Sequence, residues 1–166
     1  MKPLKPIKPN IIDVEASGFG PDSYPIEVGV VLSNGDRYCS LIKPEDDWVY
    51  WDNSAEQVHN ISRACLFKQG KSVKTVAREL NAFLQNIIVY SDGWVVDSPW
   101  LKQLFYKANC EPSFSVSPLE SILKESQMAV WHDVKDRLMA AQDGQRHRAS
   151  YDAQLIQNTF VQTAVH

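Results

Sequence analysis

Four carboxylates in three separated segments are the residues of this chain best suited to chemistry. Asp13 and Glu15 stand two positions apart, and Asp97 and Asp152 follow much later. Carboxylate oxygens are hard ligands of the kind that Mg²⁺ and Mn²⁺ prefer. His147, five residues before Asp152, adds a side chain that ionises near neutral pH and can act as a general base. Together these residues predict a nuclease that uses two metal ions.

The first carboxylate pair lies in an apolar segment, residues 10–16, which indicates a buried strand. Successive strand side chains point to opposite faces, so Asp13 and Glu15 are expected to share one face. Buried carboxylates are costly unless compensated, and a divalent cation is the simplest compensating charge. Taken alone, an Asp-x-Glu pair is more often a strand end at the surface. The two later segments favour the catalytic interpretation.

The elements that must position these side chains are strands first and helices afterwards. We predict strands at 10–16, 25–33, 37–43, 87–90 and 114–116, and helices from the cap Ser72 to Gln85 and at 97–108, 118–141 with a break, and 149–164. The Asn34-Gly35 pair is a strong hairpin signal, so the first three strands should form an antiparallel meander. The fold class is therefore α/β, with a mixed five-stranded sheet in which strands 4 and 5 run parallel, flanked by helices.

Three sequence blocks resemble one known family. They are residues 12–19 with the following segment 25–30, residues 97–101 (Asp-Ser-Pro-Trp-Leu), and residues 147–153, which match the signature His-x-Ala-x-x-Asp-Ala. In this order they resemble the DEDDh 3′-to-5′ exonucleases, which include ribonuclease T, oligoribonuclease and the proofreading subunits of bacterial replicative polymerases. The resemblance extends over nearly the whole chain and implies the ribonuclease H-like fold.

The resemblance implies a role for each candidate residue. Asp13 would bridge two Mg²⁺ or Mn²⁺ ions, Glu15 and Asp152 would hold the ion that activates water, and Asp97 would help position the second ion. His147 would be the general base. Substrate contacts would come from backbone amides around residues 16–18, which meet the terminal 3′-hydroxyl, and from Phe19 stacking on the last base. The full set of expected substrate-binding residues is Ala16, Ser17, Gly18, Phe19, Trp94 and Arg148.

The middle block departs from the family pattern and leaves two alternatives open. Many relatives have a polar pair and then a phenylalanine before the aspartate, whereas this chain has Asp92-Gly93-Trp94-Val95-Val96 before Asp97. Asp92 is therefore a rival ligand that can replace or assist Asp97. Asp97 can also cap the helix that follows, since aspartate is a preferred N-cap and proline is favoured in the first turn.

Composition agrees with one catalytic domain, residues 1–166, that begins with an extended Lys-Pro leader at 1–9. The 166 residues, 44% of them hydrophobic, can build one sizeable core. We expect no membrane partner, because no apolar run approaches the roughly 18 residues of a membrane helix. Three widely spaced cysteines argue against a disulfide framework, so the expected location is cytoplasmic. The net charge of −3 does not favour phosphate binding, so local arginines such as Arg148 must supply the positive charge that contacts phosphate.

The leading functional hypothesis is a magnesium-dependent 3′-to-5′ exonuclease that removes nucleoside monophosphates from single-stranded RNA or DNA. The first alternative is a nucleic-acid-binding or polymerase-accessory module without strong activity of its own. The second is a ribonuclease H-like endonuclease, against which His147 and the Ser17-Gly18 turn argue. Because family members are often dimers, a homodimer is also possible. The choice between RNA and DNA stays open.

Overall fold

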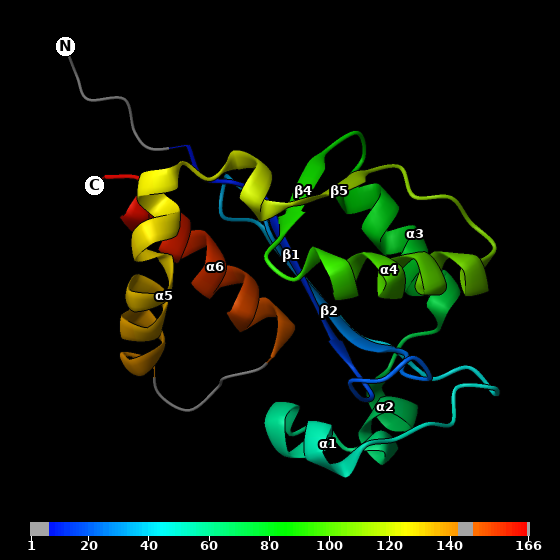
Figure 1. Ribbon diagram of the computed structural model, residues 1–166. Helices are drawn as coiled ribbons and strands as arrows, with labels where there is room; N and C mark the ends of the chain where they lie inside the picture. Colours follow the sequence, from blue (N-terminus) through cyan, green and yellow to red (C-terminus); the bar gives the residue numbers. More distant parts are fainter. Residues whose placement is uncertain (1–6, 143–147, 166) are drawn as a thin grey trace.

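The computed structural model describes residues 7–142 and 148–165, and its centre is one five-stranded sheet (Figure 1). The strand order is β3-β2-β1-β4-β5. The strands are β1 (Ile11–Ala16), β2 (Pro25–Val31), β3 (Arg37–Leu41), β4 (Ile88–Ser91) and β5 (Ser115–Pro118). β1 to β3 pair antiparallel, while β4 runs parallel to both β1 and β5. The predicted mixed sheet and its ribonuclease H-like topology are confirmed.

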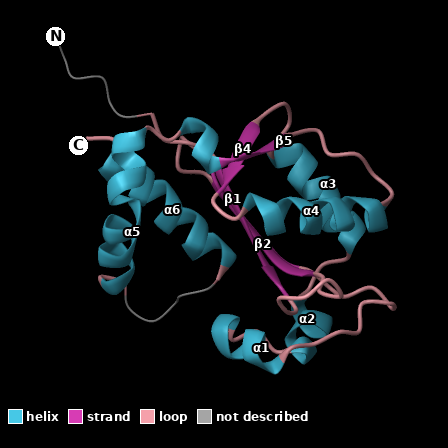
Figure 2. Ribbon diagram, in the orientation of Figure 1, coloured by secondary structure: helices cyan, strands magenta, loops and turns pink. Residues whose placement is uncertain are grey.

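Helices cover both faces of this sheet, as Figure 2 shows. They are α1 (Asn53–His59), α2 (Arg63–Gln69), α3 (Val73–Phe83), α4 (Trp94–Ala108), the 3₁₀ turn η1 (Leu119–Ile122), α5 (Glu125–Ala140) and α6 (Ala149–Thr163). α3 and α4 lie on one side of the sheet and α5 and α6 on the other. No helix in the described part of the chain is long and apolar enough to cross a membrane.

Side chains of β1 alternate between two hydrophobic cores. Ile12 and Val14 belong to the core that α3 and α4 close, whereas Ile11 packs in a second core with Trp131 of α5 and Ile156 of α6. Because alternate strand residues share a face, Asp13 and Glu15 continue the Ile11 face toward α6. The predicted shared face of the two acids is confirmed.

The start of α6 is fixed against β2 by a very close backbone approach. A Cβ atom added to Gly29 would lie 2.3 Å from the backbone nitrogen of Ser150 and 2.4 Å from the carbonyl carbon of Ala149. Two residues earlier on β2, the fully buried Glu27 accepts a hydrogen bond of 2.7 Å from the Ala149 amide. Strand β2 therefore determines where α6 begins.

We expect Gly29→Ala to destabilise the protein, because the added methyl group collides with backbone that has no freedom to rotate away. Overpacking of this kind costs about 1–3 kcal/mol. Urea denaturation at fixed pH measures the loss. Gly20→Ala is the matched control, since a Cβ atom there meets nothing within 4 Å. Equal midpoints for the two variants would contradict the close packing of α6 on β2.

Two helices differ from the sequence-based prediction. α4 begins at Trp94 with Gly93 as N-cap, three residues before the expected start at Asp97. The amides of Val96 and Asp97 already donate to the Gly93 carbonyl, so Asp97 lies inside the helix and is not its cap. α1 was not predicted; it is a seven-residue helix whose N-cap Asp52 accepts from the Ser54 amide. Ser72 caps α3, as expected, and Ser62 caps α2.

Candidate active site

Three carboxylates converge where β1 meets the first turn of α6. One carboxylate oxygen from each of Asp13, Glu15 and Asp152 lies within 4.8 Å of the other two. β1 supplies the first pair from its α6-facing side, and α6 brings Asp152 from the opposite end of the sequence. The sequence-based prediction that these acids form one cluster agrees with this geometry.

Asp97 reaches the same region because of the parallel register of β1 and β4. Ile11 is the Cα partner of Tyr90, so β4 ends beside Asp13 and the chain then turns into α4. Asp97 lies in the first turn of that helix and is only 3% exposed. Its Oδ2 accepts a hydrogen bond of 2.7 Å from the hydroxyl of Ser91, the last residue of β4.

The four acids repel one another in a site where Asp97 is buried and the other three are partly buried. Burial raises the pKa of Glu15 to about 9, and a hydrogen bond to Asp152 and then the charge of Asp152 add to the effect. Burial is also the main cause that raises the pKa of Asp97 to about 7. The pKa of Asp13 lies well above its ordinary value, first because of burial and then because of Asp97 and Glu15. Positive charge is what this site lacks.

The donor set fits a hard divalent cation. All the clustered ligand atoms are carboxylate oxygens, which suit Mg²⁺ or Mn²⁺, whereas structural zinc sites rely on cysteine and histidine. Asp13, Glu15 and Asp152 would hold the ion, and Asp97 lies close enough to raise the pKa of Asp13 by its charge. A bound cation would offset the repulsion between the acids, which adds to burial in raising their pKa values.

Asp92, the rival ligand, is already paired. Its Oδ2 lies 2.8 Å from Nζ of Lys135 on α5. Among the charges that raise the pKa of Asp13, Asp97 acts most strongly and Asp92 least. Asp97 is therefore the better candidate for the fourth acid. Lys135 is a site residue that sequence analysis missed, and its position in a long polar helix gives no signal that distinguishes it from a solvated lysine.

The same strand and helix arrangement occurs in solved nuclease structures. E. coli Exonuclease I in complex with a dA16 oligonucleotide matches with a TM-score of 0.70 and 14% identity, covering 93% of this chain and 40% of that chain. The zinc-bound E. coli ExoI–ssDNA complex matches with a TM-score of 0.66 and 15% identity, covering 93% and 39%. Exonuclease I from Methylocaldum szegediense matches with a TM-score of 0.67 and 12% identity, covering 92% of this chain and 40% of that chain. The chain has the fold of Exonuclease I.

This chain spans about two fifths of the length of the Exonuclease I structures, 40% in the dA16 complex. At 12–15% identity the likeness to Exonuclease I establishes the fold, and any activity must be argued from the site itself. Scans against protein-family models and curated proteins found no match. The fold agrees with the resemblance to DEDDh exonucleases that the three sequence blocks carry.

The end of β1 and the loop between β1 and β2 contain four of the six expected substrate-binding residues. Ser17 is fully buried, and its amide donates to the Tyr24 carbonyl at 3.0 Å, so this amide already has an acceptor. Ala16 is buried at the end of β1, and a Cβ atom on Gly18 would lie 2.6 Å from the Tyr50 ring. Phe19, by contrast, is 72% exposed at the loop tip.

Phe19 borders a groove beside the acid cluster. The groove has a volume of about 270 Å³, and its walls are the β1–β2 loop and the first turns of α4, including Val96 and Trp100. Ser23 also lines it, and the Ser23 hydroxyl is buried without a hydrogen-bond partner in the described structure. Aromatic and apolar walls with two polar side chains, Ser23 and Gln103, suit a nucleobase and its sugar.

Two further expected substrate contacts already have protein partners. The guanidinium of Arg148 pairs with Glu27, with Nη2 at 2.6 Å from Oε2, and the indole of Trp94 donates to the Val116 carbonyl at 3.1 Å. Glu27 stands opposite Glu15 in the β1–β2 ladder, so Arg148 neutralises a buried charge next to the cluster. Contacts of Arg148 and Trp94 with substrate stay predictions. His147 lies outside the described residues.

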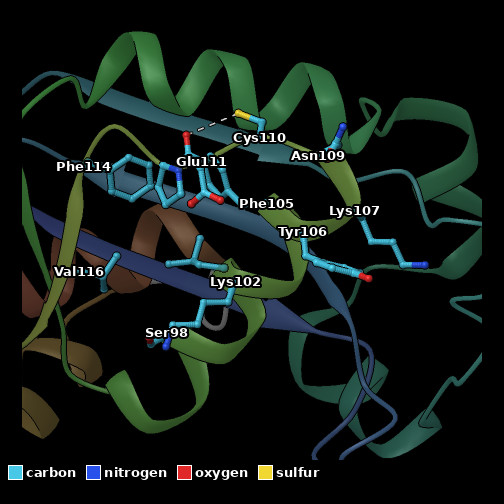
Figure 3. A pocket seen from close by; sticks show the side chains of 12 residues that line it. Ser98, Lys102, Phe105, Tyr106, Lys107, Asn109, Cys110, Glu111, Phe114 and Val116 are labelled. Carbon is cyan, nitrogen blue, oxygen red and sulfur yellow. Dashed lines mark hydrogen bonds between the residues drawn. The ribbon is translucent and has the colours of Figure 1, made fainter.

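A larger pocket lies away from the acids. Its volume is about 850 Å³, and its lining comes from α4, from the loop that follows and from β5. Figure 3 shows Phe105 and Phe114 in this pocket, with Lys102 and Tyr106 also on its lining. None of the four candidate acids lines it. Size alone therefore does not identify the candidate active site of this chain.

Proposed function

We propose that this chain is a metal-dependent 3′-to-5′ exonuclease that releases nucleoside monophosphates from single-stranded nucleic acid. The observation that carries the proposal is the carboxylate cluster of Asp13, Glu15 and Asp152, with Asp97 beside it, on the fold of Exonuclease I. Mutual repulsion between these acids destabilises the folded chain. Bound cations would offset this repulsion and would serve phosphate chemistry.

In the proposed reaction two divalent cations would activate water and stabilise the leaving 3′-oxygen. The charges of both Asp97 and Glu15 raise the pKa of Asp13, and Asp13 would hold both cations. Glu15 and Asp152 would hold the ion on the α6 side, and Asp97, oriented by Ser91, would hold the one on the α4 side. His147 would accept the proton of the attacking water; its assignment rests on the sequence motif alone.

Single-stranded DNA is the first substrate to test, because E. coli Exonuclease I was solved with dA16 and with dT13 oligonucleotides. Gel analysis of 5′-labelled single strands of DNA and of RNA, with Mg²⁺ or Mn²⁺ and with EDTA, separates the hypotheses. Metal-dependent shortening from the 3′ end supports the exonuclease. Cleavage of circular single strands would indicate an endonuclease instead. Binding without any cleavage would favour an accessory module.

We expect Phe19→Ala to weaken productive binding of the 3′ end, because in the proposed complex the exposed ring would stack on the last base. Stacking contributes about 1–3 kcal/mol per base, which corresponds to a rise in KM of roughly 5- to 150-fold. Steady-state kinetics on a single-stranded oligonucleotide measure this effect. Val49→Ala, another exposed apolar residue, is the control. Unchanged KM in Phe19→Ala would remove Phe19 from the substrate site.

Two finer parts of the proposal need their own measurements. A homodimer follows from the family resemblance, and the molar mass in solution decides it. A cytoplasmic location follows from the sparse, unpaired cysteines, all three of which are free thiols in the structure. Neither property changes the chemistry proposed for the acid cluster.

A further inference from the structure

Lys135 brings a positive charge into the acid cluster from α5. Its Nζ donates to Oδ2 of Asp92 at 2.8 Å, and its side chain is 29% exposed. Burial would lower the pKa of Lys135, but the charge and hydrogen bond of Asp92 outweigh it, followed by the charges of Asp13 and Asp152. The ion pair with Asp92 places the ammonium group just after β4, the strand that lies next to β1 and its two acids.

The packing of α5 holds Lys135 in this place. Trp131, one helical turn earlier, is buried in the core shared with Ile11 of β1 and Ala153 of α6. Residues four apart lie on the same side of a helix, so Lys135 leaves α5 on the side that faces β1 and the start of α6. The exposed Arg137 is two positions further along and leaves the helix in another direction.

Charge balance indicates what the ammonium group is for. Two divalent cations would match the charge of the four acids, so Asp92 and the incoming phosphodiester are the anions left for the Lys135 ammonium group to contact. An ammonium group has three N–H donors, of which Asp92 takes one. Lysine binds phosphate as a point charge, so it needs no particular bidentate geometry at the oxygen it contacts.

We propose that Lys135 is a substrate-binding residue that contacts a nonbridging oxygen of the scissile phosphate, with Asp92 holding the ammonium group in position. This inference rests on the proposed exonuclease function. It assigns to α5 a direct part in the site, in addition to the acids of β1, α4 and α6.

The first test compares kcat/KM on a single-stranded oligonucleotide in Mg²⁺. Lys135→Met should lower kcat/KM by about 10- to 100-fold, the magnitude of one hydrogen bond to a charged group. Lys135→Arg should recover part of the activity. Arg137→Met removes the same charge from the exposed face of the same helix and should match the wild type. Wild-type values for Lys135→Met would overturn the inference while leaving the exonuclease function intact.

The second test separates phosphate contact from a purely structural tie. Binding of deoxyadenosine 5′-monophosphate and of deoxyadenosine is measured by calorimetry in Mg²⁺. Lys135→Met should weaken binding of the monophosphate roughly tenfold and leave binding of the nucleoside unchanged. Equal losses of monophosphate and nucleoside binding in Lys135→Met would show that Lys135 acts only through the fold. A wild type without nuclease activity would instead contradict the proposed function itself.

Discussion

Asp13→Asn is expected to reduce exonuclease activity by about 10³-fold or more while leaving the protein folded. Bound metal ions contribute several kcal/mol of transition-state stabilisation, and each 1.36 kcal/mol corresponds to a factor of ten in rate. Asparagine keeps the shape of the side chain but removes the charge that would hold both cations. The loss should appear as slower shortening of a 5′-labelled strand from its 3′ end, measured under single-turnover conditions in Mg²⁺.

The control for Asp13→Asn is Asp133→Asn, which removes an exposed carboxylate from α5 and should retain full activity. Stability in EDTA gives a second check. Because Asp97, Glu15 and Asp152 all raise the pKa of Asp13, removing its charge relieves repulsion, and the variant should unfold no earlier than the wild type. Substantial activity in Asp13→Asn would show that the cluster is not the catalytic centre.

The second large effect is expected in the dependence of stability on pH and metal. The pKa of Glu15 is about 9 in the folded chain and near its ordinary value of 4.5 in the unfolded chain. Between these limits the folded chain keeps a proton that the unfolded chain has released, so raising the pH favours unfolding. Asp97, with a pKa of about 7, acts in the same direction between its ordinary 3.8 and 7. In EDTA, stability should therefore be higher near pH 5 than near pH 8.

A saturating divalent cation should reverse much of this loss at pH 8. A ligand at about 100 times its Kd stabilises the folded state by about 2.7 kcal/mol. For a chain of this size that corresponds to a rise in Tm of roughly 5–10 °C. Thermal unfolding in EDTA and in Mg²⁺ at both pH values measures the difference. Glu15→Gln should flatten the pH dependence in EDTA, and a pH-independent Tm in the wild type would argue against the buried cluster.

Local sequence signals were sufficient to predict the sheet and most of its helices. Apolar alternation in β1, the Asn34-Gly35 turn and the serine caps of α2 and α3 each rest on interactions within a few residues. The start of α4 was wrong because Asp97 before Ser-Pro has the pattern of a cap. In the folded chain its carboxylate bonds to Ser91 instead, a partner that only the end of β4 can provide.

No local sequence pattern predicts the ion pairs around the acid cluster. Asp92 with Lys135 and Glu27 with Arg148 join residues from different elements, and their partners depend on how α5 and α6 pack on the sheet. Glu27 also accepts a hydrogen bond from the Ala149 amide at the start of α6. The partners of Glu27 depend on the register of β2 and on how α6 packs against the sheet. Neither can be predicted from a single sequence.

The dependence of the site on α6 has a consequence for synthesis of the protein. The ribosome delivers β1 first, and Asp152 emerges only after every strand of the sheet. Until α6 docks against Gly29, a nascent chain lacks one of the three clustered carboxylates and leaves Glu27 without Arg148. If the proposed function is correct, a nascent chain would therefore gain nuclease activity only after α6 has docked on the sheet.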